Sequence, residues 1–169
     1  RLDRARLLEK GESAEDLARA LRAKLVEARI PTKDVVLGLS GPDTMIRYTR
    51  IPPVPAWRLK VVMQYEVREI AEKVGEPLAS DFQVLQIPRE ADTDQTILIG
   101  MVKERPFSDL LDALESEGIT VRHALLGPLA LFVAQDAFGW KPDPSEEEDD
   151  HVLMADLGSE NLALALVLN

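Results

Sequence analysis

The apolar positions of the chain repeat with helical spacing in two long segments. After Ser13, which has Asp16 three residues later in the manner of a capping box, apolar side chains recur every three or four residues until Pro31. A second stripe follows the prolines of residues 52–55 and ends at Gly75. Its members are Leu59, Val62, Met63, Val67 and Ile70. Each segment is predicted to be an amphipathic helix with one buried face.

Two shorter helices are predicted in the second half of the chain. Residues 106–119 place several leucines on one side, and Gly118 ends the segment. Residues 127–139 are apolar nearly all round, which predicts burial between two layers. A strand or extended link over residues 120–126 joins these two helices.

Short or alternating apolar runs predict strands between the helices. Residues 34–40 and 44–51 are predicted to form a hairpin around a Gly-Pro-Asp turn. Residues 81–87 and 96–102 form a second pair, in which the more apolar 96–102 is expected to be central. The chain closes with two apolar strands around a Gly turn, over residues 151–168.

The order of these elements predicts a mixed α/β protein with one inserted unit. From about residue 34 to 118 the chain runs hairpin, helix, two strands and helix, with short connections. Such a segment forms a small sheet with helices on one face and can bury a modest core. The first helix, the apolar helix and the closing hairpin are then parts of a second layered structure, which the inserted unit interrupts.

Composition narrows the classes of function. Hydrophobic residues make up 46% and charged residues 30%, as in ordinary globular proteins, and no apolar run approaches the roughly 20 residues of a membrane span. The chain has no cysteine and only His123 and His151, so neither a thiolate nor a His-rich metal site is expected. A net charge of −10 disfavours nucleic acid and anionic lipid as partners. Residues 143–150 hold six acidic residues and predict a solvated loop, or else a calcium or partner site.

The segment VVLGLSGPDTMIRYTRIPPVPAWRLKVVMQYEVREIAEKV resembles the insert subdomain of the actin-like PilM/FtsA group. In that group a strand pair ending in an Arg-x-Ile-x-Pro phrase leads into a long helix, and Arg50, Ile51, Pro52, Pro53 and Pro55 come close to this phrase. DFQVLQI, TILIGMVKERPFSDLLDALESEGI, HALLGPLALFVAQDAFG and VLMADLGSENLALALVL continue in the order of the family. The resemblance covers almost the whole chain and rests on this succession of elements.

The resemblance implies a small SHS2-like insert subdomain with part of an actin-like (RNase H-like) lobe. Residues 1–33 and 119–150 would belong to the first lobe, residues 34–118 to the insert, and residues 151–169 would begin the second lobe. Nothing before Ser13 resembles a first phosphate hairpin, so the chain is expected to be the middle part of a longer protein. A PilM-like type IV pilus assembly protein fits better than a division protein of the FtsA type, because the loops are short. The cytoplasmic domain of the type II secretion protein GspL is a third relative.

The turn of the closing hairpin is the candidate phosphate site. Gly158 permits close backbone approach, amides of the turn can point at phosphate oxygens, and Asp156 can hold a magnesium-bound water. The alternative is a plain hairpin. By resemblance Asp156, Gly158 and Ser159 would contact the nucleotide, with ATP and magnesium bound by the full-length protein and neither bound by this chain alone. Glu160 stands where the family often has Thr or Ser, and its charge disfavours nucleotide binding and, still more, hydrolysis.

The second hypothesis is a protein-binding module, which we favour over an enzyme because no catalytic constellation stands out. In the PilM group a cytoplasmic peptide of the membrane protein PilN lies in a groove between the insert and the first lobe. The resemblance places this groove near residues 46–59 and the helix of residues 127–138. Its candidate anchors are Arg47, Tyr48, Arg50 and Trp57, which have the planar and cationic groups of recognition hot spots. Alternatively, the two strand arginines simply face solvent. The expected role is a cytoplasmic scaffold, capable of self-association, held at the inner membrane through its partner.

Overall fold

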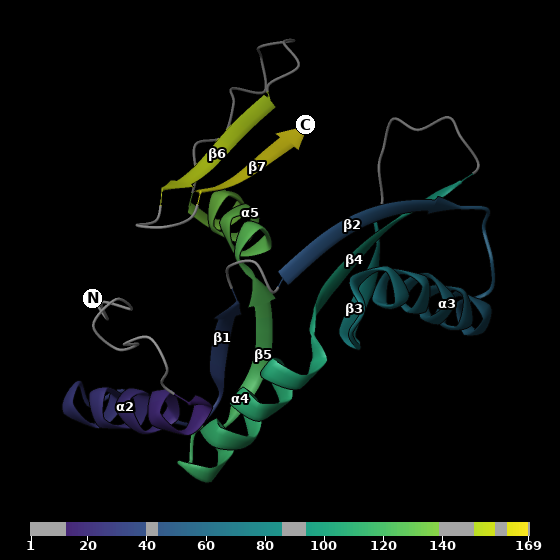
Figure 1. Cartoon of the computed structure of the whole chain (residues 1–169). Helices are drawn as coiled ribbons and strands as arrows, with labels where there is room; N and C mark the ends of the chain where they lie inside the picture. The colour runs from purple at the N-terminus through teal and green to yellow at the C-terminus, as the bar shows by residue number, and fades with distance from the viewer. Residues whose placement is uncertain (1–12, 40–43, 86–93, 139–150, 158–161, 169) are drawn as a thin grey trace. The chain divides into compact units, whose positions relative to one another are not determined.

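A computed structural model shows a mixed α/β fold (Figure 1). It describes residues 13–39, 44–85, 94–138, 151–157 and 162–168. Within these ranges the chain forms four helices and seven strands, and the strands make three separate sheets. The fold divides into two compact units, residues 1–35 with 42–121 and residues 36–41 with 122–169.

The first unit is built on an antiparallel sheet of three strands in the order β2–β4–β3. These strands are β2 (Thr44–Ile51), β3 (Leu78–Leu85) and β4 (Gln95–Lys103). The central β4 alternates between its two faces, and Ile97, Ile99 and Met101 are buried on one of them. The predicted central position of this apolar segment is therefore confirmed.

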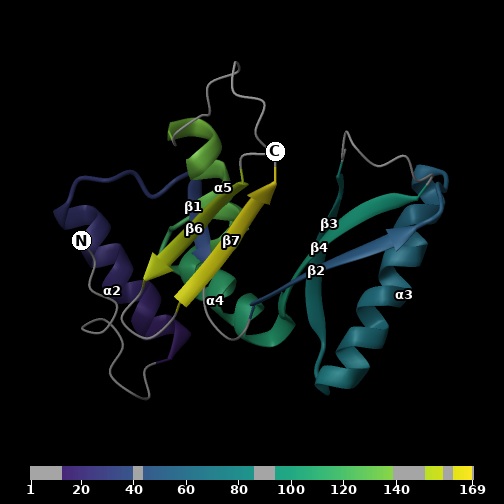
Figure 2. The ribbon, with the colours of Figure 1, turned by 90° about the horizontal axis from the view of Figure 1, so that it is seen from above.

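Helix α3 (Ala56–Val74) packs against this sheet, and Figure 2 shows it lying along one sheet face. Leu59, Met63 and Ile70 of α3 are buried in one core with the apolar side chains of β4. Gly75 ends the helix in the left-handed conformation (φ 84°), and its N–H donates to the carbonyl of Ala71. The predicted helical stripe and its glycine stop are both confirmed.

Helices α2 (Ala14–Glu27) and α4 (Glu104–Ser116) pack against each other in the same unit. The small Ala18 of α2 and Leu114 of α4 are almost completely buried. The capping box forms as predicted: the Asp16 N–H donates to Ser13 Oγ (3.3 Å), and the Ser13 N–H donates to the Asp16 carboxylate (3.4 Å). Helix α2 belongs to the same compact unit as the β2–β4–β3 sheet, and the assignment of residues 1–33 to an actin-like lobe stays a prediction.

The second unit contains most of the pair β1 (Val35–Leu39) and β5 (Val121–Leu126), the helix α5 (Gly127–Phe138) and a two-stranded ribbon. The ribbon pairs β6 (His151–Leu157) with β7 (Leu162–Leu168) in antiparallel register, which confirms the predicted closing strands. Helix α5 packs against this ribbon.

Two predictions about these elements are wrong. The segment predicted to form a hairpin with β2 is β1, which instead pairs with β5. The N–H of Val35, the first residue of β1, donates to the carbonyl of Thr120, just before β5. Strand β2 pairs with β4 along all eight residues, from Thr44 opposite Val102 to Ile51 opposite Gln95. Helix α5 is not buried all round: Phe132 is 47% exposed, because the two-stranded ribbon covers only part of the helix surface.

Candidate peptide-binding surface

The candidate surface for a partner peptide is centred on β2, which is an edge strand. One side of β2 pairs with β4 along its whole length. Among the residues that the structure describes, no strand pairs with its other side. An edge strand presents unpaired backbone N–H and C=O groups, and an extended peptide can add to it as a further strand.

The side chains of β2 divide between the two faces of the sheet. Met45 packs against the core beneath α3, so Arg47, two residues on, lies on the α3 side. Tyr48 and Arg50 lie on the opposite side. Tyr48 is 61% exposed and stands directly across from Leu98 of β4. This face offers an aromatic ring and a guanidinium group beside the open edge.

Arg47 lies on the α3 side of the sheet, and its charge affects Glu69 of that helix. The pKa of the Glu69 carboxyl lies below its ordinary value, and the main cause is Lys73, whose ammonium group donates a hydrogen bond of 2.6 Å to it. The charge of Arg47 lowers the pKa of Glu69 further. Arg47 is thus electrostatically coupled to the outer surface of α3.

Trp57 lies in the first turn of α3 and is 74% exposed. The buried Leu59, Met63 and Ile70 mark the side of the helix that faces the sheet, and Trp57 projects from the other side. The four anchors predicted from the sequence therefore occupy three surfaces, and only Tyr48 and Arg50 share one. The two predicted walls of the groove, residues 46–59 and 127–138, belong to different compact units. Contact of these anchors with a peptide stays a prediction.

The sheet face that carries Tyr48 also includes apolar residues that the sequence analysis did not single out. In the register of the sheet, Tyr48, Leu98 and Gln83 form one row across the three strands, and Ile46 lies opposite Gly100 in the next row. Ile46 and Leu98 are only half-buried. The sequence could have indicated this surface, because alternate residues of β4 point to opposite faces and a second apolar row therefore lies on the side away from α3.

The candidate phosphate site is described only in part. Asp156 is exposed in β6, opposite Ala163 of β7. Gly158 and Ser159, like the acidic residues 143–150, lie outside the described residues. Phosphate contact by the turn stays a prediction.

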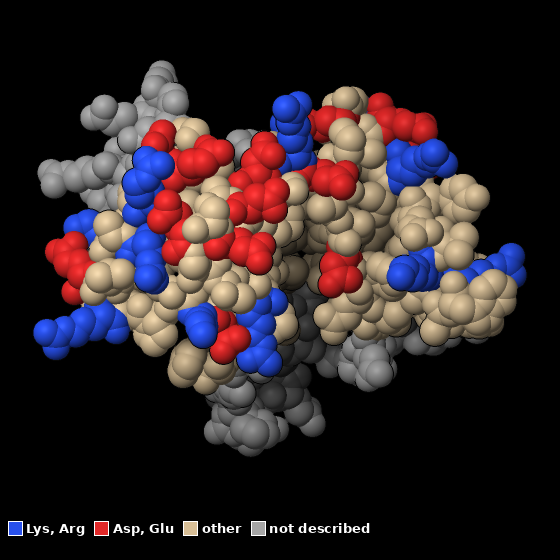
Figure 3. Space-filling model, turned by 90° about the horizontal axis from the view of Figure 1, so that it is seen from below, with Lys and Arg blue, Asp and Glu red and all other residues tan. Residues whose placement is uncertain are grey.

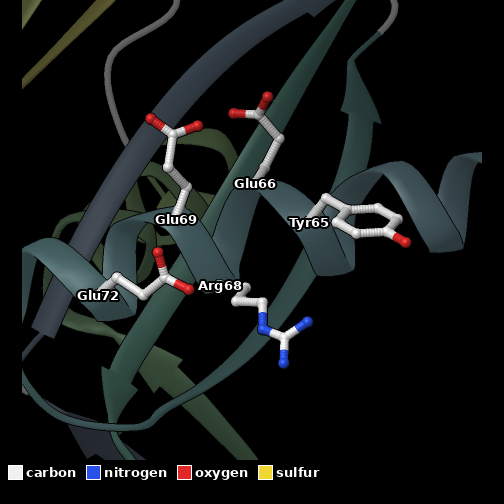
Figure 4. Close-up of a pocket in the computed structure, with 5 residues that line it drawn as sticks. All are labelled: Tyr65, Glu66, Arg68, Glu69 and Glu72. Atoms are coloured by element: carbon white, nitrogen blue, oxygen red, sulfur yellow. The ribbon is translucent and has the colours of Figure 1, made fainter.

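A shallow hollow of about 250 Å³ lies on the exposed side of α3 (Figure 4). Its lining consists of Tyr65, Glu66, Arg68, Glu69 and Glu72. All five come from one helix, so the hollow has no opposing wall and cannot enclose a small molecule. No cluster of three or more potential metal ligands occurs in the part of the chain that the structure describes.

Charged residues of both signs are spread over one face of the described residues (Figure 3). The face drawn in Figure 3 carries Asp and Glu side chains interspersed with Lys and Arg, without a continuous basic area. None of the described helices is long and apolar enough to cross a membrane. This face therefore has no electrostatic footprint of a nucleic-acid site.

Comparison with known proteins identifies a likeness of fold but none of sequence. No protein-family model matches the chain, and no curated protein matches it by sequence. Its fold is similar to that of a chain in the solved structure described as a "PilM-PilN type IV pilus biogenesis complex", with a TM-score of 0.74 and 23% sequence identity. The match covers 99% of this chain and 49% of the other, so this chain spans about half of its neighbour's length. The likeness confirms the PilM-like α/β fold that the order of elements predicts.

Proposed function

We propose that this chain is part of a scaffold of a type IV pilus assembly complex, or of a related secretion complex, at the cytoplasmic face of an inner membrane. The scaffold holds a short peptide from a membrane-anchored, PilN-like partner. The fold likeness supports this proposal, because the similar chain comes from a structure described as a complex of PilM with PilN. In the full-length protein the second lobe would complete a site for ATP and magnesium.

The observation that carries the proposal is the open edge of β2. A peptide strand added there gains main-chain hydrogen bonds along up to eight residues of β2. Tyr48 and Arg50 flank this edge on one face, and β2 is followed by Pro52, Pro53 and Pro55, which restrict the backbone. A rigid site loses little conformational freedom on binding, so more of the contact energy appears as affinity.

The charge of the chain favours a protein partner over direct membrane attachment. A net charge of −10 repels anionic lipid headgroups, and a peripheral position at the membrane would then depend on the anchored partner. The alternative functions are an ATP-hydrolysing protein of the FtsA division type and a GspL-like domain. Neither has an observation of its own in the described residues.

The test is fluorescence anisotropy with a labelled peptide from the cytoplasmic tail of the PilN-like partner, titrated with the full-length protein. Tyr48→Ala and Arg50→Ala should each lose at least about 2 kcal/mol, roughly 30-fold in affinity, if they are anchors. Gln83→Ala is the matched control, since Gln83 occupies the same sheet face on the opposite edge strand. It should bind as tightly as the parent.

Backbone pairing is tested separately with peptides that are N-methylated at alternate positions. One of the two methylation patterns should weaken binding about tenfold or more, because it removes the N–H groups that face β2. Unchanged affinity of both side-chain variants would show that the peptide binds another surface. A full-length protein that ignores the peptide would refute the scaffold function itself.

A further inference from the structure

Helix α3 carries an exposed apolar stripe on the side opposite to the core. Trp57, Val61 and Tyr65 follow one another at four-residue intervals and are 74%, 44% and 67% exposed. Residues spaced four apart lie one above the other on a helix. The core that α3 shares with the sheet is formed by Leu59, Met63 and Ile70, and this second stripe lies outside it. Exposed apolar surface of this kind is typical of a protein-binding site.

The charges beside the stripe are arranged so that α3 is complementary to itself. Arg58 and Glu69 are both exposed and stand eleven residues apart, just over three whole turns, which places them on the same flank of the stripe. The basic residue lies near the beginning of the helix and the acidic one lies in its second half. Two antiparallel helices facing each other through this stripe would bring Arg58 of each copy beside Glu69 of the other.

We propose that two copies of this chain associate through their α3 helices, packed antiparallel around a two-fold axis near Met63 and Gln64. The same register that pairs Arg58 with Glu69 also fits the apolar positions. It places Val61 of one copy against Tyr65 of the other. An isologous interface repeats every contact twice, so one favourable pair counts double.

The ends of the stripe fit together in this register as well. Arg68 continues the stripe one turn beyond Tyr65 and would lie against Trp57 of the other copy. An arginine over an indole face gains a cation–π interaction. Figure 4 shows the Arg68 and Glu69 side chains leaving α3 in different directions, so Arg68 can meet the ring while Glu69 meets Arg58.

The expected association is weak and reversible. Helix α3 has 19 residues and is about 28 Å long, and a single pair of such helices buries less than the roughly 1,200 Å² of a standard stable interface. A lipid surface fits the stripe less well than a second copy, because Glu66, Glu69 and Glu72 surround its second half. This inference is independent of the proposed peptide function, which uses the other face of the sheet.

The first experiment is sedimentation equilibrium of the purified chain from about 10 μM to 1 mM. The parent should show a concentration-dependent monomer–dimer equilibrium. Trp57→Ala and Tyr65→Ala should each weaken the dimer at least about tenfold, because each removes two contacts from the interface. Phe138→Ala is the matched control: this aromatic side chain is 91% exposed and lies on α5, so its loss should leave the dimer unchanged.

The second experiment exchanges the charges. Arg58→Glu alone and Glu69→Arg alone each place like charges together twice in the dimer, and each should weaken it about tenfold. The double variant Arg58→Glu/Glu69→Arg restores opposite charges and should return to within about threefold of the parent. The ion pair of Glu69 with Lys73 is lost in both variants that change Glu69, so it does not account for the rescue.

The third experiment determines the relative orientation of the two α3 helices by disulfide cross-linking. The chain has no cysteine of its own, so only the introduced cysteines can react. Gln64→Cys lies near the two-fold axis and should oxidise to a covalent dimer. Glu72→Cys should not, because the two thiols would be more than about 20 Å apart in the antiparallel pair. A chain that stays monomeric at 1 mM, a dimer insensitive to the charge changes, or efficient cross-linking only through position 72 would each overturn the proposal.

Discussion

The backbone N–H of Val35 donates a hydrogen bond of 2.9 Å to the carbonyl oxygen of Thr120. The N–H of Thr120 donates in turn to the carbonyl of Thr32, also at 2.9 Å. Residues far apart in the sequence are thus joined where the chain enters and leaves the segment that holds β2, α3, β3, β4 and α4. The two ends of this segment therefore meet at one place. That the segment is an inserted unit stays a prediction.

The closure can be tested through the amide of Thr120. Thr120→Pro removes the N–H that binds Thr32 and should lower the free energy of unfolding by at least about 1 kcal/mol more than Thr120→Ala does. Thr120 is exposed, so its side chain alone should matter little. Urea denaturation followed by circular dichroism measures both variants. Equal stabilities would show that this hydrogen bond does not hold the segment closed.

Replacing Gly75 by alanine should destabilise the fold more than the same replacement of Gly38. Its φ of 84° is strained for any residue with a Cβ, so Gly75→Ala should cost about 1 kcal/mol, although nothing lies within 4 Å of the added atom. Gly38 in β1 also has free space around it but no positive φ, and Gly38→Ala is the control. Thermal denaturation should show a lower midpoint for the first variant only.

Local periodicity explains which parts of the fold the sequence predicts. The stripe of α3, its stop at Gly75 and the central position of β4 follow from neighbouring residues alone, and all three are confirmed. The partner of β1 could not be predicted in this way, because β5 comes about 80 residues later, after β2, α3, β3, β4 and α4. The local Gly-Pro-Asp turn favoured a hairpin with β2, but β1 pairs with β5 instead.

The grouping of the candidate anchors was predicted less well, for a different reason. These residues were grouped by their chemical type, without asking to which side of the strand or helix each side chain points. Arg47 and Tyr48 are neighbours in a strand, so they lie on opposite faces of the sheet. Trp57 precedes the buried Leu59 by two residues, which separates their directions on a helix by about 200°. Both separations were readable from strand and helix periods. The open edge of β2 was not, because it depends on the strand order.

Glu69 should titrate below the ordinary range of a glutamate, chiefly because of Lys73. The hydrogen bond and charge of Lys73 favour the carboxylate, so Lys73→Met should raise the pKa of Glu69 more than Arg47→Met does. A depressed folded-state pKa stabilises the fold above the unfolded-state value, and this contribution disappears as the pH falls through the folded-state pKa. NMR titration of the Glu69 carboxyl measures its pKa in both variants and shows which substitution raises it more. A larger effect of the Arg47 variant would contradict it.

The chain alone should not bind ATP with useful affinity. By resemblance, an actin-like site closes around the nucleotide from two lobes, and this chain matches only 49% of its structural neighbour. By resemblance, the closing hairpin would supply only some of the amides for the phosphates, and the hollow on α3 has no opposing wall that could enclose an adenine ring. Isothermal titration of Mg-ATP should show no saturable heat at submillimolar nucleotide.

If the chain alone did bind Mg-ATP, a matched pair of variants would show whether the closing hairpin is the site. Asp156→Ala removes the carboxylate proposed to act through magnesium, whereas Asp81→Ala removes an exposed strand carboxylate on β3. If the chain gave a micromolar isotherm that only Asp156→Ala abolished, the closing hairpin would bind nucleotide without a second lobe. Heat that both variants retain would come from binding elsewhere. Absence of heat in the chain, with binding in the full-length protein, is the outcome that we expect, because the resemblance implies that two lobes together surround the nucleotide.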